Sequence, residues 1–375
     1  MTNTKRILFA GYAPVHFLCF LPVYELLRND PRLEIWLSGG FQRKEEEGIR
    51  YELEGFYDPY PVDRDRVTDF DRIRHEAFDV LVSAHSSTDF FPRSVGRSVQ
   101  IFHGVSFKNF GIREKTLRHD ILCLPGRYHA EQFGVQGLLD TGDAEFLLTG
   151  FPKVDRLVAD PKDREERLKR LGLDPARPTV LYAPTGGKHN SLDSAGEEII
   201  AAIAGDRRWN LLVKPHDHPK KAVDWFTVLA PREDERVKLV RDLDVVPYLR
   251  AADCLLTDAS SVSMEYSLLD RPMVFFDVPE LLGNVMKRGG ALDLASYGRR
   301  LGTIAGSAAE VVPCIAGALA NPGRESELRR RAARHMFHEP GNAAANVAGV
   351  VLHAAGLRSE LPEGVERVSA TRSGV

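Results

Sequence analysis

The chain has 375 residues, of which 43% are hydrophobic and 27% are charged, a balance typical of soluble globular proteins. This length exceeds what one ordinary core needs and suits two α/β domains. The formal net charge of -3 and the pI near 6.5 argue against a dedicated nucleic-acid binder, because affinity for the phosphate backbone requires a clustered basic surface.

No stretch approaches the ~20 apolar residues that a membrane-spanning helix requires. The most apolar early segment, residues 17–27, contains Pro22 and Glu25 and has the wrong flanks for a signal peptide. The four cysteines form no CxxC pair and indicate neither a zinc site nor a disulfide frame, so we expect a protein of the reducing cytoplasm. Peripheral contact with the inner face of the cell membrane stays open.

Short β-rich runs alternate with amphipathic stretches, the pattern of parallel βα units. In chain order, the first series predicts helices at residues 18–27 and 129–139 and strands at residues 6–10, 33–38, 79–83, 99–102, 121–124 and 145–148. Gly150-Phe151-Pro152 then breaks the pattern. We therefore expect an N-terminal, acceptor-side Rossmann-like domain over residues 1–155.

A second series predicts strands at residues 179–183, 210–214, 237–240, 254–256 and 273–276, with helices at residues 195–204, 222–229, 246–252 and 262–269. It indicates a donor-nucleotide-binding Rossmann-like domain over residues 156–340. Two doubly wound α/β domains then face each other across a cleft, where ligands bind beyond the carboxyl ends of the strands. A helix at 341–356 is expected to pack on the first domain, and residues 357–375 to form a flexible tail.

The most informative segment is Thr257-Asp258-Ala259-Ser260-Ser261, where a buried strand ends and a helix begins. A helix start carries unpaired N–H groups and the positive end of the helix dipole, so it attracts phosphate. Thr257, Ser260 and Ser261 can donate hydroxyls to phosphate oxygens. Plain N-capping is the alternative, but one residue suffices for a cap. Asp258 would repel phosphate, so we expect it to hold a ribose or orient a neighbour.

Two histidines follow predicted strands. His216 ends the turn Lys214-Pro215-His216, where an imidazolium would stabilise charge on a pyrophosphate. His103 is the candidate general base for the acceptor hydroxyl, and Gly104 permits a sharp turn after it. Lys108 would neutralise an acceptor phosphate. The alternatives are a surface histidine at 216 and a histidine bonded to local backbone at 103.

Three further loops follow predicted strands. Residues 182–188 include Thr185 and two glycines that would admit a phosphate, but they lack the spacing of a Walker loop. Residues 11–16 end at His16, would line the acceptor side, and contain no GxGxxG, which disfavours a dinucleotide dehydrogenase. His85 and Ser86 follow another strand, but no GxSxG elbow supports a serine hydrolase.

The order and spacing of these motifs resemble the CDP-glycerol glycerophosphotransferases of teichoic acid and capsule synthesis. The resemblance spans about residues 100–280, and the first hundred residues match only in general pattern. Its motifs are His103-Gly104 with Lys108, Thr149-Gly150-Phe151-Pro152-Lys153-Val154-Asp155, Leu181-Tyr182-Ala183-Pro184-Thr185, Lys214-Pro215-His216, Ala252-Asp253, the 257–261 segment, Leu269-Asp270-Arg271-Pro272 and Phe275-Phe276.

The resemblance implies a GT-B fold that holds the donor mainly in its second domain. It implies transfer of glycerol phosphate, or a related polyol phosphate, from a CDP-alcohol to an acceptor hydroxyl, with release of CMP. Lipid-linked saccharides are among the acceptors that the resemblance implies. CDP-glycerol or a similar nucleotide is then a co-substrate. No resident cofactor and no metal-ligating residues are implied, and the need for a divalent metal ion stays open. The expected catalytic residues are His103, His216 and Asp258, and the expected substrate-binding residues are Gly104, Lys108, Thr185, Gly186, Lys214, Thr257, Ser260, Ser261 and Glu265.

Two departures from the family pattern bear on the donor alcohol and the acceptor. Lys153 and Val154 stand where the family often has Asn or Arg, and Gly186 stands where it has an aromatic or basic residue. The chain also lacks the extra domain of large membrane-bound polymerases, which favours a single addition or an unusual acceptor. The rival functions are a GT-B nucleotide-sugar glycosyltransferase or UDP-sugar 2-epimerase, and a non-catalytic nucleotide-binding protein.

Overall fold

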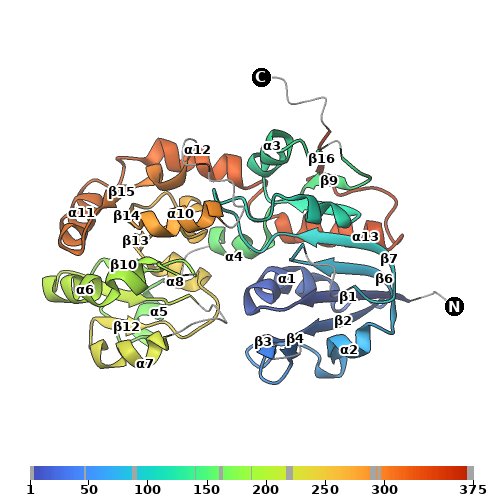
Figure 1. Ribbon diagram of the computed structural model, residues 1–375, viewed down its shortest axis with the longest axis horizontal. Helices are drawn as coiled ribbons and strands as arrows, with labels where there is room; N and C mark the ends of the chain where they lie inside the picture. Colours follow the sequence, from blue (N-terminus) through green and yellow to red (C-terminus); the bar gives the residue numbers. More distant parts are fainter. Residues whose placement is uncertain are drawn as a thin grey trace. The chain divides into compact units, whose positions relative to one another are not determined.

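The computed structural model describes residues 4–45, 48–86, 91–139, 141–159, 164–186, 188–216, 223–287, 293 and 297–369 (Figure 1). The chain forms two compact units, which are described one at a time. Unit 1 comprises Met1–His103, Gly111–Asp155 and His335–Val375, and unit 2 comprises Gly104–Phe110 and Arg156–Arg334. The predicted boundaries differ from these in two places, because residues 104–110 group with unit 2 and residues 335–340 with unit 1.

Unit 1 is built on an eight-stranded sheet in the order β16-β9-β8-β7-β6-β1-β2-β5. Every neighbouring pair is parallel except β16 with β9. The strands are β1 (Lys5–Gly11), β2 (Leu33–Gly39), β5 (Val67–Thr68), β6 (Ala77–Ser83), β7 (Ser94–Ile101), β8 (Ile121–Leu124), β9 (Glu145–Leu148) and β16 (Glu366–Arg367), with a separate hairpin of β3 (Phe41–Glu45) and β4 (Gly48–Glu52).

The order of the strands in unit 1 creates a topological switch point. The chain begins at β1, adds β2 and β5 on one side, and then adds β6 to β9 on the other side. The connections after β1 and β6 therefore leave in opposite directions, and doubly wound sheets bind ligands at such a point. The loops that follow β1 and β6 are consequently the first place to look for function in unit 1.

Helices cover this sheet: α1 (Pro14–Leu27), α2 (Phe70–Ile73), α3 (Arg127–Val135) and α13 (Ala343–Ala354), with short 3-10 turns η1 (Arg64–Arg66), η2 (Glu114–Arg118) and η3 (Pro152–Val154). Helix α13 packs against α1 and against β6 and β7, so a C-terminal helix completes the core of the N-terminal sheet (Figure 1). Both helices are apolar and mostly buried, as expected for elements enclosed by a sheet and a neighbouring helix.

The expected flexible tail is ordered as far as it is described. Residues 366–367 form β16, and the amide of Val368 donates to the carbonyl oxygen of Phe146 at 2.9 Å. Pro362 packs on Gly349 of α13, and His338 contacts the carbonyl oxygen of Gly364 at 2.8 Å. The prediction of a flexible tail from residue 357 was wrong here, because apolar side chains in a polar segment are enough to anchor it. Residues 370–375 lie outside the described part.

Unit 2 contains a six-stranded parallel sheet in the order β12-β11-β10-β13-β14-β15. Its strands are β10 (Thr179–Tyr182), β11 (Asn210–Val213), β12 (Val237–Leu239), β13 (Cys254–Thr257), β14 (Met273–Phe276) and β15 (Thr303–Ala305). The chain starts at β10, adds β11 and β12 on one side and β13 to β15 on the other. The switch point of unit 2 therefore lies between β10 and β13.

The helices of unit 2 begin near the boundary with α4 (Asp155–Val158) and end with α12, which runs on into unit 1. They are α5 (Arg164–Arg170), α6 (Ser191–Asp206), α7 (Trp225–Leu229), α8 (Val246–Ala251), α9 (Val262–Ser267), α10 (Pro279–Lys287), α11 (Ala308–Ala320) and α12 (Ser326–Met336), with turns η4 (Ala230–Arg232) and η5 (Gly298–Leu301). Four of the strands, β10, β11, β13 and β14, are buried along their whole length, as in a parallel sheet covered on both faces.

The predicted fold class is confirmed: the chain forms two α/β units with doubly wound, largely parallel sheets. All eleven predicted strands are present within a few residues of their expected bounds. Within the described residues, no helix combines the length and the apolar character needed to cross a bilayer.

Candidate active site

Three histidines gather at the switch point of unit 1. His16 begins α1 after β1, His85 follows β6, and His103 follows β7, the next strand in the sheet. The ring centroid of His16 lies 4.6 Å from that of His103 and 5.8 Å from that of His85. Tyr12 closes the group, with its ring 4.7 Å from His16 and 4.6 Å from His85. Loops that are far apart in sequence therefore place three imidazoles at one sheet edge.

Hydrogen bonds to the backbone define the tautomer of His103. Its Nδ1 lies 2.6 Å from the carbonyl oxygen of Ala84, and since a carbonyl can only accept, Nδ1 carries a proton. In the neutral ring Nε2 then holds the free electron pair. As a residue, His103 is exposed. His103 is thus bonded to backbone, as the alternative interpretation expected, and this bond leaves Nε2 as the acceptor of the neutral ring.

Two further contacts hold the loop that carries Ala84. The hydroxyl of Ser83 accepts from the amide of His85 at 3.2 Å and donates to its carbonyl oxygen at 3.0 Å. His119 is buried, and its Nε2 donates to the same carbonyl oxygen at 3.2 Å. The carbonyl group that orients His103 therefore belongs to a rigid turn.

The surroundings of His103 favour its neutral form. Close packing of protein around the ring lowers its pKa below 6.5, and the positive charge of Lys153 lowers it further, while the hydrogen bond to Ala84 opposes both. Lys153 is buried and lies in the same unit. A histidine with a lowered pKa is unprotonated near neutral pH, which is the form a general base requires.

Asp258 lies at the switch point of unit 2 and is fully buried. Its carboxylate accepts four hydrogen bonds: Oδ1 from the amides of Thr185 at 2.8 Å and Ala259 at 2.7 Å, and Oδ2 from the amide and the hydroxyl of Ser191, both at 2.9 Å. It ties the loop after β10 and the start of α6 to the end of β13. Asp258 therefore holds the neighbouring backbone in place. Its carboxylate is buried and already accepts from four donors, so it does not fit the expected catalytic role or contact with a ribose.

A short segment of chain, Gly104–Phe110, contributes to the same edge of unit 2. The Nζ of Lys108 donates to the hydroxyl of Thr185 at 3.1 Å. A Cβ placed on Gly104 would lie 3.7 Å from the Oγ of Ser261, so this backbone passes close to the start of α9. Lys108, Thr185, Gly104 and Ser261, all expected to bind substrate, thus form one polar cluster.

The turn after β11 borders this cluster. His216 is exposed, and its ring packs on the backbone of Gly186, where an added Cβ would lie 2.6 Å from Nδ1. This contact explains why a glycine stands at 186 in place of the bulkier residue expected from the family pattern. Lys214 is buried, and its amide donates to the carbonyl oxygen of Tyr182 at 2.9 Å.

Five of the nine expected substrate-binding residues are buried: Thr185, Lys214, Thr257, Ser260 and Glu265. The hydroxyl of Thr257 donates to the carbonyl oxygen of Ala183 at 2.7 Å, so its proton is already in a hydrogen bond with the backbone. Ser260 is 4% exposed and Glu265 is fully buried within α9. Helix α9 has only six residues, so its dipole is small. Ser261, which is half-buried and makes no capping bond, is the hydroxyl of this segment best placed to meet a ligand.

The motif at residues 149–155 serves the fold of unit 1. Asp155 accepts from the amides of Gly341 at 2.8 Å, Ala343 at 3.3 Å and Ala344 at 2.7 Å, and so caps α13. Gly150 has a φ of 88°, and a Cβ there would come within 2.4 Å of the carbonyl oxygen of His338. This glycine is required by both its backbone conformation and its close neighbour.

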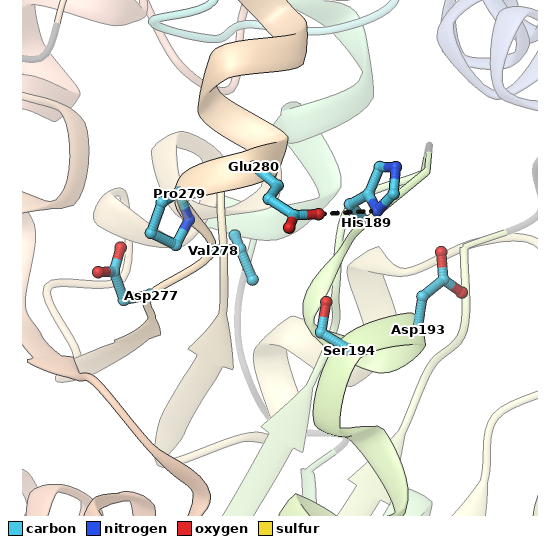
Figure 2. A pocket seen from close by; sticks show the side chains of 7 residues that line it. All are labelled: His189, Asp193, Ser194, Asp277, Val278, Pro279 and Glu280. Atoms are coloured by element: carbon cyan, nitrogen blue, oxygen red, sulfur yellow. Dashed lines mark ion pairs between the residues drawn. The ribbon is translucent and has the colours of Figure 1, made fainter.

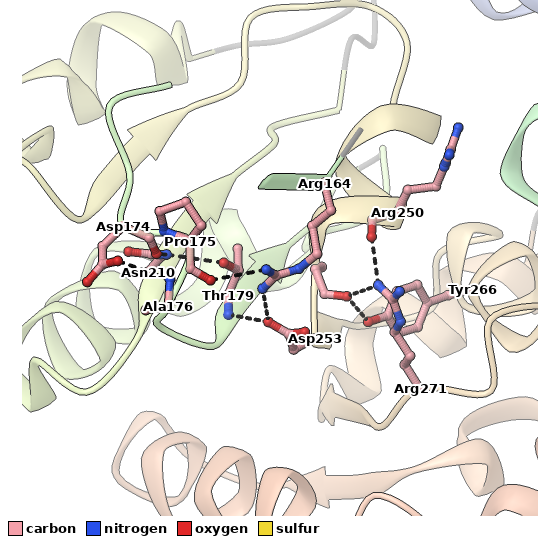
Figure 3. A network of polar contacts seen from close by, with 11 residues as sticks. Arg164, Asp174, Pro175, Ala176, Thr179, Asn210, Arg250, Asp253, Tyr266 and Arg271 are labelled. Atoms are coloured by element: carbon pink, nitrogen blue, oxygen red, sulfur yellow. Dashed lines mark hydrogen bonds and ion pairs between the residues drawn. The ribbon is translucent and has the colours of Figure 1, made fainter. Parts of the chain in front are cut away.

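The residues 252–253 and 271 of the family-like motifs also serve the fold, at the amino ends of the strands in unit 2 (Figure 3). Asp253 accepts from Arg164 at 2.6 Å and from the amide of Thr179 at 2.8 Å. The Nη1 of Arg271 donates to the carbonyl oxygens of Arg250 at 2.7 Å and Ala252 at 2.6 Å. This network fixes the sheet at the edge opposite to the loops that carry the polar cluster.

A pocket of about 430 Å³ lies in unit 2 between the loops after β10 and β14 (Figure 2). His189 and Glu280 pair across it, with 3.0 Å between Nδ1 and Oε2, and His189 has a φ of 61°, which is strained for a side chain of this kind. None of the expected site residues lines this pocket. Its lining residues are His189, Asp193, Ser194, Asp277, Val278, Pro279 and Glu280.

His16 was expected in a loop that lines the acceptor side and Lys153 in the 149–155 motif, but neither residue was expected to act on His103. No role was expected for His85, Ser191 or His119. A usable signal existed for His16 and His85, because each follows a predicted strand as His103 does. Nothing in the sequence marks Ser191 or His119, and nothing in it shows that Lys153 acts on His103, since these contacts depend on which strands become neighbours. Among the described residues, no three His, Cys, Asp or Glu side chains are placed to hold a metal ion.

The chain thus combines two doubly wound α/β units, with three histidines at the switch point of unit 1 and hydroxyl and cationic groups at the switch point of unit 2. The family model of CDP-glycerol:poly(glycerophosphate) glycerophosphotransferase matches residues 76–353. This match covers most of the chain, which therefore belongs to that family. The resemblance expected from the motifs is confirmed.

Curated relatives are similar over part of their lengths. The chain is 24% identical over 275 residues to the teichoic acid glycerol-phosphate primase of Bacillus spizizenii, covering 65% of this chain and 66% of the relative. It is 30% identical over 180 residues to the teichoic acid poly(glycerol phosphate) polymerase of Staphylococcus epidermidis, covering 45% and 24%. The matched part thus amounts to less than two thirds of these relatives' lengths.

Solved structures show the same fold. The wall teichoic acid polymerase TagF superposes with a TM-score of 0.64 at 19% identity, over 96% of this chain and 91% of that chain. The Staphylococcus aureus MnaA–UDP complex superposes with a TM-score of 0.61 at 14% identity, over 96% and 99%. The GT-B fold predicted from the family resemblance is confirmed by these two neighbours.

Proposed function

We propose that this protein transfers glycerol phosphate, or a related polyol phosphate, from a CDP-alcohol to an acceptor hydroxyl and releases CMP. The observation that carries the proposal is His103: a member of this family holds a histidine at a switch point with Nδ1 bonded to a carbonyl and Nε2 free. A free and neutral Nε2 is what the deprotonation of a hydroxyl requires.

In the proposed reaction, His103 removes the proton from the acceptor hydroxyl as its oxygen attacks the alcohol-bearing phosphorus. A bond forms between this oxygen and phosphorus, and the bond from phosphorus to the bridging oxygen breaks. CMP leaves with the electron pair, and the proton stays on His103 until solvent removes it. Charge grows on the phosphate oxygens, so cationic and hydroxyl groups near them lower the barrier.

Unit 2 supplies the groups that we propose for the donor phosphates. Lys108, Thr185, Ser261 and His216 contribute an ammonium group, two hydroxyls and an imidazole at or beside one sheet edge. Asp258 accepts a hydrogen bond from the amide of Thr185 and so fixes the position of Thr185 in this cluster. Its own negative charge is buried and occupied by four donors, which limits its repulsion of a diphosphate.

We propose a hydroxyl-bearing glycopolymer or lipid-linked saccharide as the acceptor. This follows the relatives, which are named for teichoic acid primase and polymerase activities. A protein acting on a lipid-linked acceptor would meet it at the inner face of the membrane, which makes a peripheral location part of the same proposal.

A UDP-sugar enzyme is the second candidate, because related proteins point to it. The fold is shared with the MnaA–UDP complex, and the chain is 28% identical over 159 residues to the lipid-A-disaccharide synthase of Burkholderia lata. In that case the attack would fall on a sugar carbon and UDP would leave.

A screen of donors separates these functions. The full chain is incubated with CDP-glycerol, CDP-ribitol or UDP-N-acetylglucosamine and with hydroxyl acceptors, including a synthetic lipid-linked disaccharide, and the released nucleotide is identified by mass spectrometry. We expect CMP from a CDP-alcohol only in the presence of an acceptor. UDP release, or CDP-alcohol binding in calorimetry without CMP release from any acceptor, would reject the proposal.

A further inference from the structure

His16 lies beside His103 in unit 1, yet the proposed reaction leaves it without a role. Its Nδ1 accepts a hydrogen bond from the amide of Tyr12 at 3.2 Å, so Nδ1 is unprotonated. A neutral imidazole has one proton, which must then sit on Nε2. His16 therefore offers a donor at Nε2, whereas His103 offers an acceptor at Nε2.

We propose that His16 is a second catalytic residue, whose Nε2–H donates to the oxygen of the attacking hydroxyl while His103 takes the proton. This inference rests on the proposed function and deepens it. A hydroxyl both donates and accepts, so it fits between one donor and one acceptor. The two rings lie at van der Waals distance, with centroids 4.6 Å apart and planes inclined by 48°.

The surroundings keep His16 in this state. Burial lowers the pKa of His16 well below 6.5, and the neighbouring His103 and His85 lower it further, so His16 stays neutral and keeps one N–H. A Cβ added at Gly11 would lie 2.7 Å from the Cβ of His16 and 3.1 Å from its Nδ1, so the loop after β1 packs on this ring. Since only 2% of His16 is exposed, a group as small as a hydroxyl is what can reach it.

The bond from His16 strengthens during the reaction. As the proton moves to Nε2 of His103, the oxygen between the rings gains negative charge, and a fixed N–H donor stabilises that charge more than it stabilises the neutral hydroxyl. Such a donor raises the turnover number and contributes little to donor binding, because the nucleotide contacts proposed above lie in unit 2. Loss of one donor of this kind costs roughly 100-fold in rate.

Replacement of His16 tests the proposal by activity. We expect H16F to lower CMP release roughly 100-fold, with CDP-glycerol affinity by calorimetry within about twofold of wild type, and H16Q to restore part of the rate because its amide reaches toward the same place. The control is H129F: His129 is equally buried in unit 1 but packs between Phe102 and Tyr128, and its loss should leave the rate unchanged. An H16F rate within threefold of wild type would overturn the role of His16.

Nitrogen NMR of the histidine-labelled full chain tests the tautomers directly and does not depend on the folding of a variant. We expect protonated Nε2 in His16 and protonated Nδ1 in His103. The opposite tautomer in His16 would overturn the inference even if activity is lost on mutation. If wild type releases CMP but His16 fails either test, only this inference falls, whereas absence of CMP release by wild type rejects the proposed function itself.

Discussion

Lys153 is a buried cation in the same unit as His103, the residue proposed as the base. Its ammonium group lowers the pKa of His103. An imidazolium forms less readily near another cation, so the charge extends the working range of the base toward lower pH.

Replacement of Lys153 should therefore change the pH profile. His103 acts unprotonated, so the rate falls as pH drops through its pKa. K153M removes the charge, raises this pKa, and should move the acid limb of kcat/KM to higher pH. The exposed K115M serves as control. An acid limb that stays in place, or moves to lower pH, would contradict the coupling between Lys153 and His103.

Asp258 makes a different prediction, because its role is to hold other groups. D258A leaves four buried donors without their acceptor, and each unsatisfied donor costs about 1–3 kcal/mol. We expect a free energy of unfolding at least about 3 kcal/mol lower by urea titration, together with weaker CDP-glycerol binding. An unchanged free energy of unfolding would show that the four hydrogen bonds contribute little to stability.

Two buried histidines of unit 1 make stability depend on pH. Burial lowers the pKa of His129 to about 3 and that of His119 to about 4. Both are neutral in the fold but protonate near 6.5 when unfolded, so the unfolded state binds more protons between these values and stability falls as pH drops below 6.5.

The His129 contribution can be isolated by mutation. Between pH 7 and pH 5, protonation of His129 in the unfolded state should lower the free energy of unfolding by about 2 kcal/mol. This follows from about 1.36 kcal/mol for each pH unit below 6.5. H129F removes the titrating group, so its free energy of unfolding should fall by about 2 kcal/mol less than that of wild type over this range. Parallel pH dependence in the two proteins would rule out the assignment.

At the scale of elements, the connection between the 149–155 motif and α13 decides how unit 1 closes. The C-terminal helix packs on α1 and on two strands, and Asp155 caps its start from a distant part of the chain. Asp155 is also the last residue of the segment Gly111–Asp155 of unit 1, so one carboxylate joins the end of this segment to the start of α13.

Loss of this cap should weaken unit 1. D155A should lower the free energy of unfolding by about 1–2 kcal/mol, the usual cost of losing a helix cap. D71A is the control, because the Asp71 side chain is 94% exposed and pairs only loosely, at 3.9 Å from Arg74. Equal stability of D155A and D71A in urea titrations would show that α13 needs no cap from Asp155.

Most individual strands could be predicted because buried parallel strands are short, continuous apolar runs. Strands β3, β4, β5, β15 and β16 escaped prediction, since they are brief or polar and exist only through their pairing. Residues 357–369 look disordered by composition, yet Pro362 and Val368 find apolar partners that no local pattern reveals. The elements that escaped prediction therefore depend on long-range contacts, which local sequence patterns do not show.

Prediction of the candidate site was also limited by contacts between residues that are far apart in the sequence. His103, Lys108, Thr185 and Ser261 were predicted because each follows a strand in a family-like motif. The grouping of residues 104–110 with unit 2 was not predicted, because it depends on Lys108 reaching Thr185 and on the amide of Asp293 donating to Phe107. Thr257 and Asp258 were expected near substrate, but their polar atoms are consumed by the backbone and side chains that shape the site.

At the scale of the whole molecule, the proposed reaction takes its base from unit 1 and its donor contacts from unit 2. The most direct measurement compares CMP release from CDP-glycerol by wild type and H103A, with H75A as an exposed control in the same unit and donor affinity measured by calorimetry. We predict a loss of roughly 100- to 10,000-fold in turnover for H103A, with donor affinity and the H75A rate near those of wild type. Turnover of H103A close to that of wild type would contradict the central claim.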